Sequence, residues 1–221
     1  MKVGILGTGM VGHALANKFI ELGHHVMMGA RSSGNEKAQR WKQTAGELAE
    51  IGEFEQVAKI AEIVVFAVRG DVILEVAKLA GPDNLAGKIV IDVTNPLDFS
   101  NGMPPILIPE LSNTTSAGEE LQKLLPNSRV VKALNTVNCD VMVRPNLIPG
   151  KHDIFLCGND QAAKHAVIEI LNAFGWDNPI DLGGIRAARS TEGMMPFWLN
   201  LWQLFGHDKF NYHIVQREGG E

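Results

Sequence analysis

The sequence is poor in cysteine, in clustered basic residues and in long apolar runs. Two cysteines, Cys139 and Cys157, occur among 221 residues, and neither has another Cys or His at the spacing of metal ligands. This excludes a disulfide framework and predicts no metal site, so we expect both thiols to be buried like small apolar side chains. The formal net charge of −5, without a Lys/Arg cluster, argues against nucleic acid as a partner.

Hydrophobic segments of membrane-spanning length are also missing. The longest uninterrupted apolar stretch, Ile63–Val68, has the length of a buried strand, whereas a membrane-spanning helix needs about 18 or more apolar residues. The apolar run after Lys2 ends at Leu6, which is too short for a signal peptide. The sequence therefore predicts a cytoplasmic protein that does not associate with membranes.

Short β-branched runs alternate along the chain with longer segments of helical periodicity. The runs predict strands at Val3–Leu6, His25–Gly29, Ile63–Val68, Lys88–Asp92, Val130–Leu134 and Asp153–Cys157. The periodic segments predict helices at Met10–Leu22, Glu36–Glu50, Phe54–Ala61, Val72–Leu79, Glu119–Leu125 and Gln161–Ala173. This alternation predicts an α/β fold, a Rossmann-type doubly wound parallel sheet. We expect Asn95–Ser116 to be the longest loop.

The C-terminal part of the chain ends in a segment that is apolar on nearly all sides, Arg189–Phe205. We expect a helix here, in which Pro196 produces a kink or marks the helix start. Such a helix must be buried in the fold or in an interface, and a homodimer is the interface we expect. The sheet is thus predicted to be followed by a small α/β extension that ends in an apolar helix.

A glycine motif follows the first predicted strand and opens the first predicted helix. Gly7, Gly9 and Gly12 have the G-x-G-x-x-G spacing of dinucleotide-binding βαβ units. Gly7 would allow the tight turn, Gly9 would let the backbone approach a pyrophosphate, and Gly12 would let the helix pack closely on the strand. The N–H groups of the helix N-terminus would bind the phosphate oxygens. The motif therefore predicts a dinucleotide cofactor.

The end of the second predicted strand indicates which dinucleotide binds. NAD-preferring sites normally place Asp or Glu there, to bond the ribose 2′-hydroxyl, but this sequence has Ala30-Arg31-Ser32. The guanidinium of Arg31 can bind a 2′-phosphate, with Ser32 assisting. We therefore predict NADP(H) as the cofactor.

Polar residues follow two later strands at the edge where ligands bind in parallel sheets. Asn95 follows the strand that ends at Asp92, and Asn135 follows the strand that ends at Leu134. Either side chain could hydrogen-bond a ribose or a carboxamide, or instead cap the helix that follows it. Both interpretations stay open at this point.

Residues for side-chain proton transfer are scarce. The one tyrosine, Tyr212, has no lysine four residues later, which excludes a short-chain reductase. His13 follows the glycine motif, and we expect it to be solvated at the start of a helix. We predict no catalytic acid or base, and instead a direct hydride transfer between two rings held face to face.

Taken together, these motifs resemble the NADPH-dependent coenzyme F420 reductases and are similar to the cytosolic reductase domain of the six-transmembrane metalloreductases. The resemblance rests on the Gly7–Gly12 loop, Gly29–Ser32, the strand before Thr94-Asn95-Pro96, Val130–Thr136 and the terminal helix. It implies an NADP-binding Rossmann domain at residues 1–150 and an extension at 151–221 that completes the acceptor pocket and a dimer interface.

The resemblance also implies which residues surround the cofactor and the small-molecule electron acceptor, a flavin or deazaflavin. Thr8, Gly9, Met10 and Val11 would line the pyrophosphate, and Arg31 and Ser32 would hold the 2′-phosphate. Ala67 and Val68 would face the middle of the cofactor. The nicotinamide and the second ring would be surrounded by Ala133, Asn135 and Thr136.

Two other functions fit the same glycine motif. A non-catalytic NADP(H) sensor would bind the cofactor without turnover, which a panel of acceptors can distinguish. A small imine or pyrroline reductase is the second alternative. Those enzymes usually append a long helical dimerisation domain, and residues 150–221 leave room only for two strands and two helices.

Overall fold

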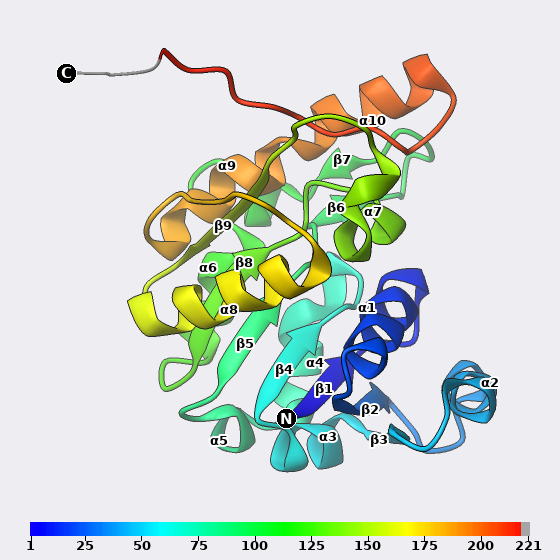
Figure 1. Ribbon diagram of the computed structural model, residues 1–221. Helices are drawn as coiled ribbons and strands as arrows, with labels where there is room; N and C mark the ends of the chain where they lie inside the picture. Colours follow the sequence, from blue (N-terminus) through cyan, green and yellow to red (C-terminus); the bar gives the residue numbers. More distant parts are fainter. Residues whose placement is uncertain (218–221) are drawn as a thin grey trace.

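In the computed structural model, which describes residues 1–217, eight strands form one sheet in the order β10-β9-β8-β5-β4-β1-β2-β3 (Figure 1). Its strands are β1 (Lys2–Leu6), β2 (His25–Ala30), β3 (Ala49–Glu53), β4 (Ile63–Phe66), β5 (Ile89–Asp92), β8 (Arg129–Ala133), β9 (Ile154–Gly158) and β10 (Pro179–Asp181). A separate antiparallel pair consists of β6 (Leu97–Asp98) and β7 (Ile106–Leu107). The Rossmann-type α/β fold predicted from the sequence is confirmed.

Helices connect most of the strands and cover both faces of the sheet. The α-helices are α1 (Met10–Glu21), α2 (Glu36–Ala45), α3 (Phe54–Ile60), α4 (Ile73–Ala80), α5 (Pro82–Leu85), α6 (Ala117–Leu124), α7 (Cys139–Val143), α8 (Gln161–Phe174), α9 (Ala188–Gly193) and α10 (Met195–Phe205). Short 3₁₀ turns are η1 (Gly70–Val72), η2 (Pro109–Leu111), η3 (Pro145–Leu147) and η4 (Ile185–Ala187). No helix among residues 1–217 is long and apolar enough to cross a membrane.

Alternation along the strands divides the core into two layers. In β4, Ile63 and Val65 pack with the helices α1, α2, α7 and α8, while Val64 and Phe66 pack with α3, α4, α5, α6 and α9. Figure 1 shows α1 and α8 in front of the sheet. Each central strand is therefore buried on both faces, which explains its nearly continuous apolar sequence.

Strand direction places the ends of the central strands at one edge of the sheet. The strands β3, β2, β1, β4, β5 and β8 are parallel, so the loops that follow them leave from the same edge. The prediction of a parallel sheet is wrong at β9, which pairs antiparallel to β8. Because of this reversal, β9 begins at the edge where β8 ends.

Two predicted segments, one helix and one loop, contain short strands that the sequence analysis did not predict. The helix predicted at Glu36–Glu50 ends at Ala45, where Gly46 takes a positive φ of 86°, and Ala49–Glu53 pairs with β2 as an extra strand. The loop predicted at Asn95–Ser116 contains β6, β7 and η2.

The predicted terminal helix consists of two helices, α9 and α10. Met194 separates them, and Pro196 lies in the first turn of α10, so the alternative in which proline marks a helix start is confirmed. The prediction of burial in the fold is wrong for most of α10, where only Met195 and Leu199 are buried. Leu204 is 75% exposed, so an interface with another protein stays a prediction for this surface.

Both cysteines are free thiols. Cys157 is buried as expected, whereas Cys139 at the start of α7 is only half-buried, which corrects the prediction for that residue.

Candidate functional site

The turn between β1 and α1 requires glycine at two of its three motif positions. Gly7 has a φ of 128°, and a Cβ there would lie 2.3 Å from the carbonyl oxygen of Ala67. A Cβ at Gly12 would lie 2.4 Å from the carbonyl oxygen of Gly7. These contacts bring the loop after β4 and the helix α1 directly against the end of β1. The turn is therefore tight, and a side chain at either position would push it apart.

Gly9 differs, because a Cβ built on it would meet no atom within 4 Å. It is exposed and forms the N-cap of α1, and no side chain caps this helix N-terminus. The first N–H groups of α1 therefore lack side-chain partners. Thr8 and Val11 are half-buried beside it, and Met10 is 81% exposed. This arrangement fits a pyrophosphate held by backbone N–H groups.

Arg31 and Ser32 directly follow β2, beside this turn. Both side chains are exposed. The turn is connected to the end of β2 by the N–H of Gly7, which donates to the carbonyl oxygen of Gly29 (3.0 Å), two residues before Arg31. The Arg31 guanidinium lies 3.4 Å from a carboxylate oxygen of Glu75 in α4. The guanidinium of Arg31 at the end of β2 can therefore bind an anionic group, and the carboxylate of Glu75 is its nearby partner in the folded chain.

The loops after β5 and β8 are joined by two asparagines. Asn95 Nδ2 donates to the carbonyl oxygen of Asn135 (2.8 Å), and Asn135 Nδ2 donates to Asn95 Oδ1 (2.9 Å). The helix-capping alternative is wrong for both residues, because other side chains cap the helices that follow them. Ser116 caps α6 and Asn138 caps α7 instead.

This part of the site is buried and contains polar atoms without partners. Thr94 is 3% exposed, Asn135 2% and Thr136 1%. Within residues 1–217, Thr94 Oγ1, Asn135 Oδ1 and Thr136 Oγ1 have no hydrogen-bond partner. Leu134, which directly precedes Asn135, has a φ of 64°, which is rare for a residue with a branched side chain. Unpaired buried oxygens and a left-handed backbone are features found at binding sites.

The predicted cofactor residues therefore lie in two groups at one edge of the sheet. The first group surrounds the β1–α1 turn with the adjoining ends of β2 and β4: Gly7, Thr8, Gly9, Met10, Val11, Gly12, Arg31, Ser32, Ala67 and Val68. The second group lies in the loop after β5, at the end of β8 and in the loop after β8: Asn95, Ala133, Asn135 and Thr136. Contact of these residues with a cofactor stays a prediction.

His13, in the first turn of α1, was expected to be solvated but is half-buried. Its Nε2 atom is buried and has no partner in the part of the chain that the structure describes. Burial, with a smaller effect of the Lys37 charge, lowers the pKa of His13. The imidazole is therefore neutral near pH 7, and His13 does not supply a positive charge to the site.

A buried ion cluster that the sequence predictions missed lies under the second group. Lys132 Nζ donates to Asp92 Oδ2 (2.9 Å) and to the carbonyl oxygen of Thr94 (2.6 Å), and it forms an ion pair with Glu192 Oε1 (2.8 Å). Lys132 and Asp92 are both 0% exposed. The signal in the sequence was a lysine inside the apolar strand Val130–Leu134, because strand alternation directs it into the core and a buried ammonium needs acidic partners.

The ammonium group of Lys132 is charged in the folded protein. Burial alone would lower the pKa of Lys132, but Asp92 and Glu192 outweigh it, and the pKa is raised. Burial raises the pKa of Glu192, opposed by Lys132 and by backbone hydrogen bonds. Glu192 nevertheless accepts the N–H groups of Ala117 (2.9 Å) and Gly118 (3.0 Å), one on each oxygen, which the ionised form satisfies best.

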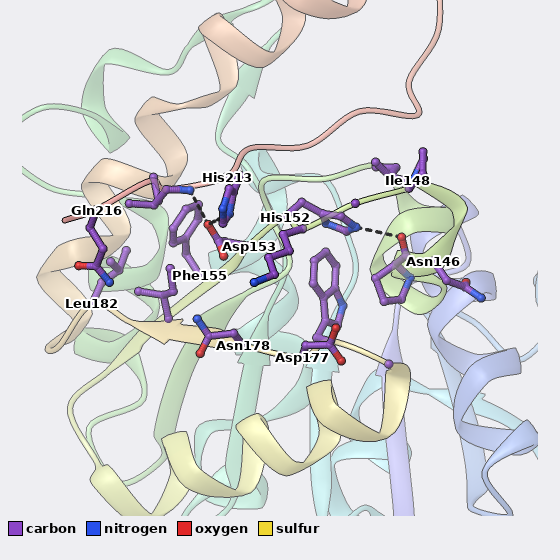
Figure 2. Close-up of a pocket in the computed structure, with 18 residues that line it drawn as sticks. Asn146, Ile148, His152, Asp153, Phe155, Asp177, Asn178, Leu182, His213 and Gln216 are labelled. Carbon is purple, nitrogen blue, oxygen red and sulfur yellow. Dashed lines mark hydrogen bonds and ion pairs between the residues drawn. The ribbon is translucent and has the colours of Figure 1, made fainter. Parts of the chain in front are cut away.

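A pocket of about 1030 Å³ lies elsewhere, between η3, the β9–β10 end of the sheet and the C-terminal segment (Figure 2). Its lining residues include none of the predicted cofactor residues. Asp153 Oδ2 accepts the N–H of Ile214 (2.6 Å) there, and His152 contacts the carbonyl oxygen of Pro145 (3.1 Å). The bond to Ile214 attaches the C-terminal segment to the start of β9, and the contact of His152 connects the same region to η3. No group of three or more potential metal ligands occurs within residues 1–217.

Comparisons with known proteins identify similar sequences and structures. The family model for coenzyme F420-dependent NADP oxidoreductases matches residues 2–96. The F420-dependent NADP reductase of Methanocaldococcus jannaschii is 30% identical over 213 residues, which cover 91% of this chain and 92% of that protein. A crystal structure from Arthrobacter sp. FB24, provisionally named for an F420-dependent NADP reductase, superposes with a TM-score of 0.92 at 41% identity, covering 98% and 100% of the two chains.

A second group of relatives is much longer than this chain. The metalloreductase STEAP3 of Rattus norvegicus is 31% identical over 204 residues, which cover 89% of this chain. The match includes only 38% of the length of that protein. The similarity therefore concerns one part of the longer protein.

Proposed function

The chain belongs to the family of coenzyme F420-dependent NADP oxidoreductases, and on this premise we propose that it transfers hydride between NADP(H) and a flavin or deazaflavin. As a member of this family it is an NADP-dependent oxidoreductase. The identity of the electron acceptor is the part that we propose. The observation that carries the proposal is the edge of the sheet where the N-terminus of α1 at Gly9, Arg31 and the half-buried Asn95–Asn135 pair follow neighbouring strands.

NADP(H) fits the residues at this edge. The N–H groups at the start of α1 would bind the pyrophosphate next to Gly9, where no side chain intrudes. The guanidinium of Arg31 would bind the 2′-phosphate after releasing or sharing Glu75. The nicotinamide half would lie near the loops after β5 and β8, where Asn135 Oδ1 and two hydroxyl groups lack partners among the described residues, 1–217.

When bound, the nicotinamide supplies the hydride chemistry, in which one hydrogen moves with two electrons to the acceptor ring. The protein's contribution is orientation and exclusion of water, because hydride transfer requires reacting atoms about 3 to 3.5 Å apart. Asn95, Asn135 and Thr136 carry no ionisable group, and His13 is neutral near pH 7, so we assign no catalytic acid or base. Residues 151–221 would complete the acceptor side, and the exposed apolar surface of α10 would form a homodimer.

The test is a panel of electron acceptors monitored by the loss of NADPH absorbance. The panel contains coenzyme F420, FMN, FAD, a ferric chelate with and without flavin, and a cyclic imine. We expect turnover with a flavin or with F420. Turnover of the imine alone would support the imine reductase alternative. Tight NADPH binding without turnover of any acceptor would favour the sensor and overturn the proposal.

A further inference from the structure

The Lys132 cluster, consisting of Lys132, Asp92 and Glu192, borders the second group of predicted cofactor residues. Lys132 directly precedes Ala133 in β8, and Asp92 is the last residue of β5. The two residues are register partners in neighbouring strands. The cluster therefore lies at the strand ends from which the Asn95 and Asn135 loops begin.

The cluster fixes the backbone of Thr94 at both of its polar groups. The N–H of Thr94 donates to Asp92 Oδ1 (2.8 Å), and its carbonyl oxygen accepts from Lys132 Nζ (2.6 Å). The next residue, Asn95, is bonded to Asn135 through both polar atoms of its side-chain amide. Buried, charge-assisted hydrogen bonds are short and directional. The conformation of both loops is therefore set from within the core.

The ion pair between Lys132 and Glu192 connects these loops to the C-terminal helices. Glu192 lies in α9, and its oxygens also accept the first N–H groups of α6. The two helices pack closely, since a Cβ at Gly118 would lie 3.0 Å from the Cβ of Ala188. A single residue, Met194, separates α9 from α10. One ammonium group thus joins the Asn95 loop to the segment that leads into α10.

The charge balance of the cluster indicates orientation as its main contribution. One cation faces two carboxylates without solvent, and burying such a group is often no more stabilising than apolar packing. The ammonium group of Lys132 has three oxygen atoms within 3.0 Å, from Asp92, Thr94 and Glu192, which restricts its position. Leu134, two residues beyond Lys132, is held in a left-handed conformation, which requires support from its surroundings.

We propose that the Lys132 cluster is a positioning device for hydride transfer. It holds the Asn95 and Asn135 loops on the nicotinamide side and connects them to the α9–α10 segment on the acceptor side. Its three members are positioning residues, which act through Thr94 and α6 and do not contact the cofactor. The proposal rests on the proposed function, because that function locates the nicotinamide at these loops.

Glu192→Gln is the test variant, with Lys164→Met as its matched control. The glutamine keeps the volume of Glu192 but turns an N–H₂ group toward one of the backbone N–H donors. Lys164 in α8 is also a buried lysine, 5% exposed and 2.7 Å from a carboxylate oxygen of Asp181. Its bonds go to Asp181 and Gly183 at the β10 end of the sheet. The control therefore removes the ion pair of a buried lysine with an exposed carboxylate, without touching the Asn95 loop.

Four measurements are made on both full-length variants and the unchanged protein: the melting temperature, the Kd for NADPH, the fluorescence of bound NADPH, and the turnover number with the acceptor found in the panel. For Glu192→Gln we expect turnover to fall at least about tenfold, while the Kd changes by less than about threefold, because misplacement by an ångström can cost about 100-fold in rate. In the control, the melting temperature should fall, while the Kd for NADPH and the turnover number should each stay within about twofold of the unchanged protein. The fluorescence of bound NADPH should be weaker in Glu192→Gln alone, because the ring is less firmly held.

Equal losses of turnover in the two variants, or unchanged turnover and fluorescence in Glu192→Gln, would overturn the proposal. If Glu192→Gln fails to fold, the double variant Lys132→Met/Glu192→Gln removes one charge of each sign and carries the same test. If the unchanged protein turns over no acceptor, the proposed function has failed. The fluorescence and Kd comparison then decides by itself whether the cluster positions the bound nicotinamide.

Discussion

Replacing Arg31 by alanine should weaken the binding of NADPH while leaving that of NADH and the stability of the fold unchanged. The Arg31 side chain is 64% exposed, and its partner Glu75 is 57% exposed. Ion pairs between exposed groups contribute about 0 to 1 kcal/mol. Because little holds Arg31 to the folded chain, we expect the melting temperature of Arg31→Ala to stay close to that of the unchanged protein.

The size of the NADPH effect follows from the charged hydrogen bonds that Arg31 would make. Losing such a bond costs about 1.5 to 3 kcal/mol, or roughly a 10- to 150-fold loss of affinity. Glu75 gives a matched variant of opposite sign. Its carboxylate competes with the 2′-phosphate for Arg31, so Glu75→Gln should tighten NADPH binding by up to about fivefold, equivalent to about 1 kcal/mol.

The assay is a calorimetric titration of both nucleotides into the three proteins, at low and high salt. The preference of the unchanged protein for NADPH over NADH should shrink in Arg31→Ala and grow in Glu75→Gln. Both effects should be smaller at high salt, because exposed charges are screened. Equal losses for NADH and NADPH in Arg31→Ala would show that Arg31 does not bind the 2′-phosphate and would refute the assignment.

Three further predictions concern the glycine turn, the ion cluster and the thiols. Gly9→Val should abolish nucleotide binding in a folded protein, because its side chain meets open space where the pyrophosphate is expected, whereas Gly7→Val should unfold it, since a Cβ there lies 2.3 Å from a backbone oxygen; circular dichroism and calorimetry distinguish the two. The pKa of Lys132 is raised above 10.5 by its carboxylate partners despite burial, so its stabilisation is complete below that pH and is lost as the pH rises through the folded-state pKa. Urea unfolding above pH 10.5 should therefore show a steeper loss of stability in the unchanged protein than in Lys132→Met. Burial raises the pKa of Cys157 to about 12, so a thiol reagent should reach Cys139 first and Cys157 only on unfolding.

The glycine turn could be predicted from the sequence because its physical requirements are local. Gly7 and Gly12 permit close backbone contacts around the β1–α1 turn, and Gly9 leaves open space at the N-terminus of α1, so the spacing of the three glycines carries this information. The extra strand β3 was missed for the opposite reason. Its residues, Ala49–Glu53, continue a helical pattern, and only pairing with β2 and the positive φ of Gly46 determine the outcome.

Long-range pairing also explains the errors at β9 and in the core. The residues of β9 are apolar whichever way the strand runs, so its direction depends on the path of α7 and η3 before it. Alternation in β8 predicts that Lys132 points into the core, but its partner Glu192 comes from a distant segment. The capping alternative for Asn95 and Asn135 was wrong because each residue has the other as its partner, forty positions away along the chain.

The two outer strands of the sheet affect how copies of this chain can meet. At one edge, β10 has only three residues and begins with Pro179, which has no N–H to donate to another strand. At the other edge, β3 exposes the carboxylates of Glu50 and Glu53, and charges on an edge strand discourage pairing with a second sheet. Both edges are therefore poor templates for aggregation through added strands. Self-association of this chain is expected to use the exposed apolar side chains of α10 instead.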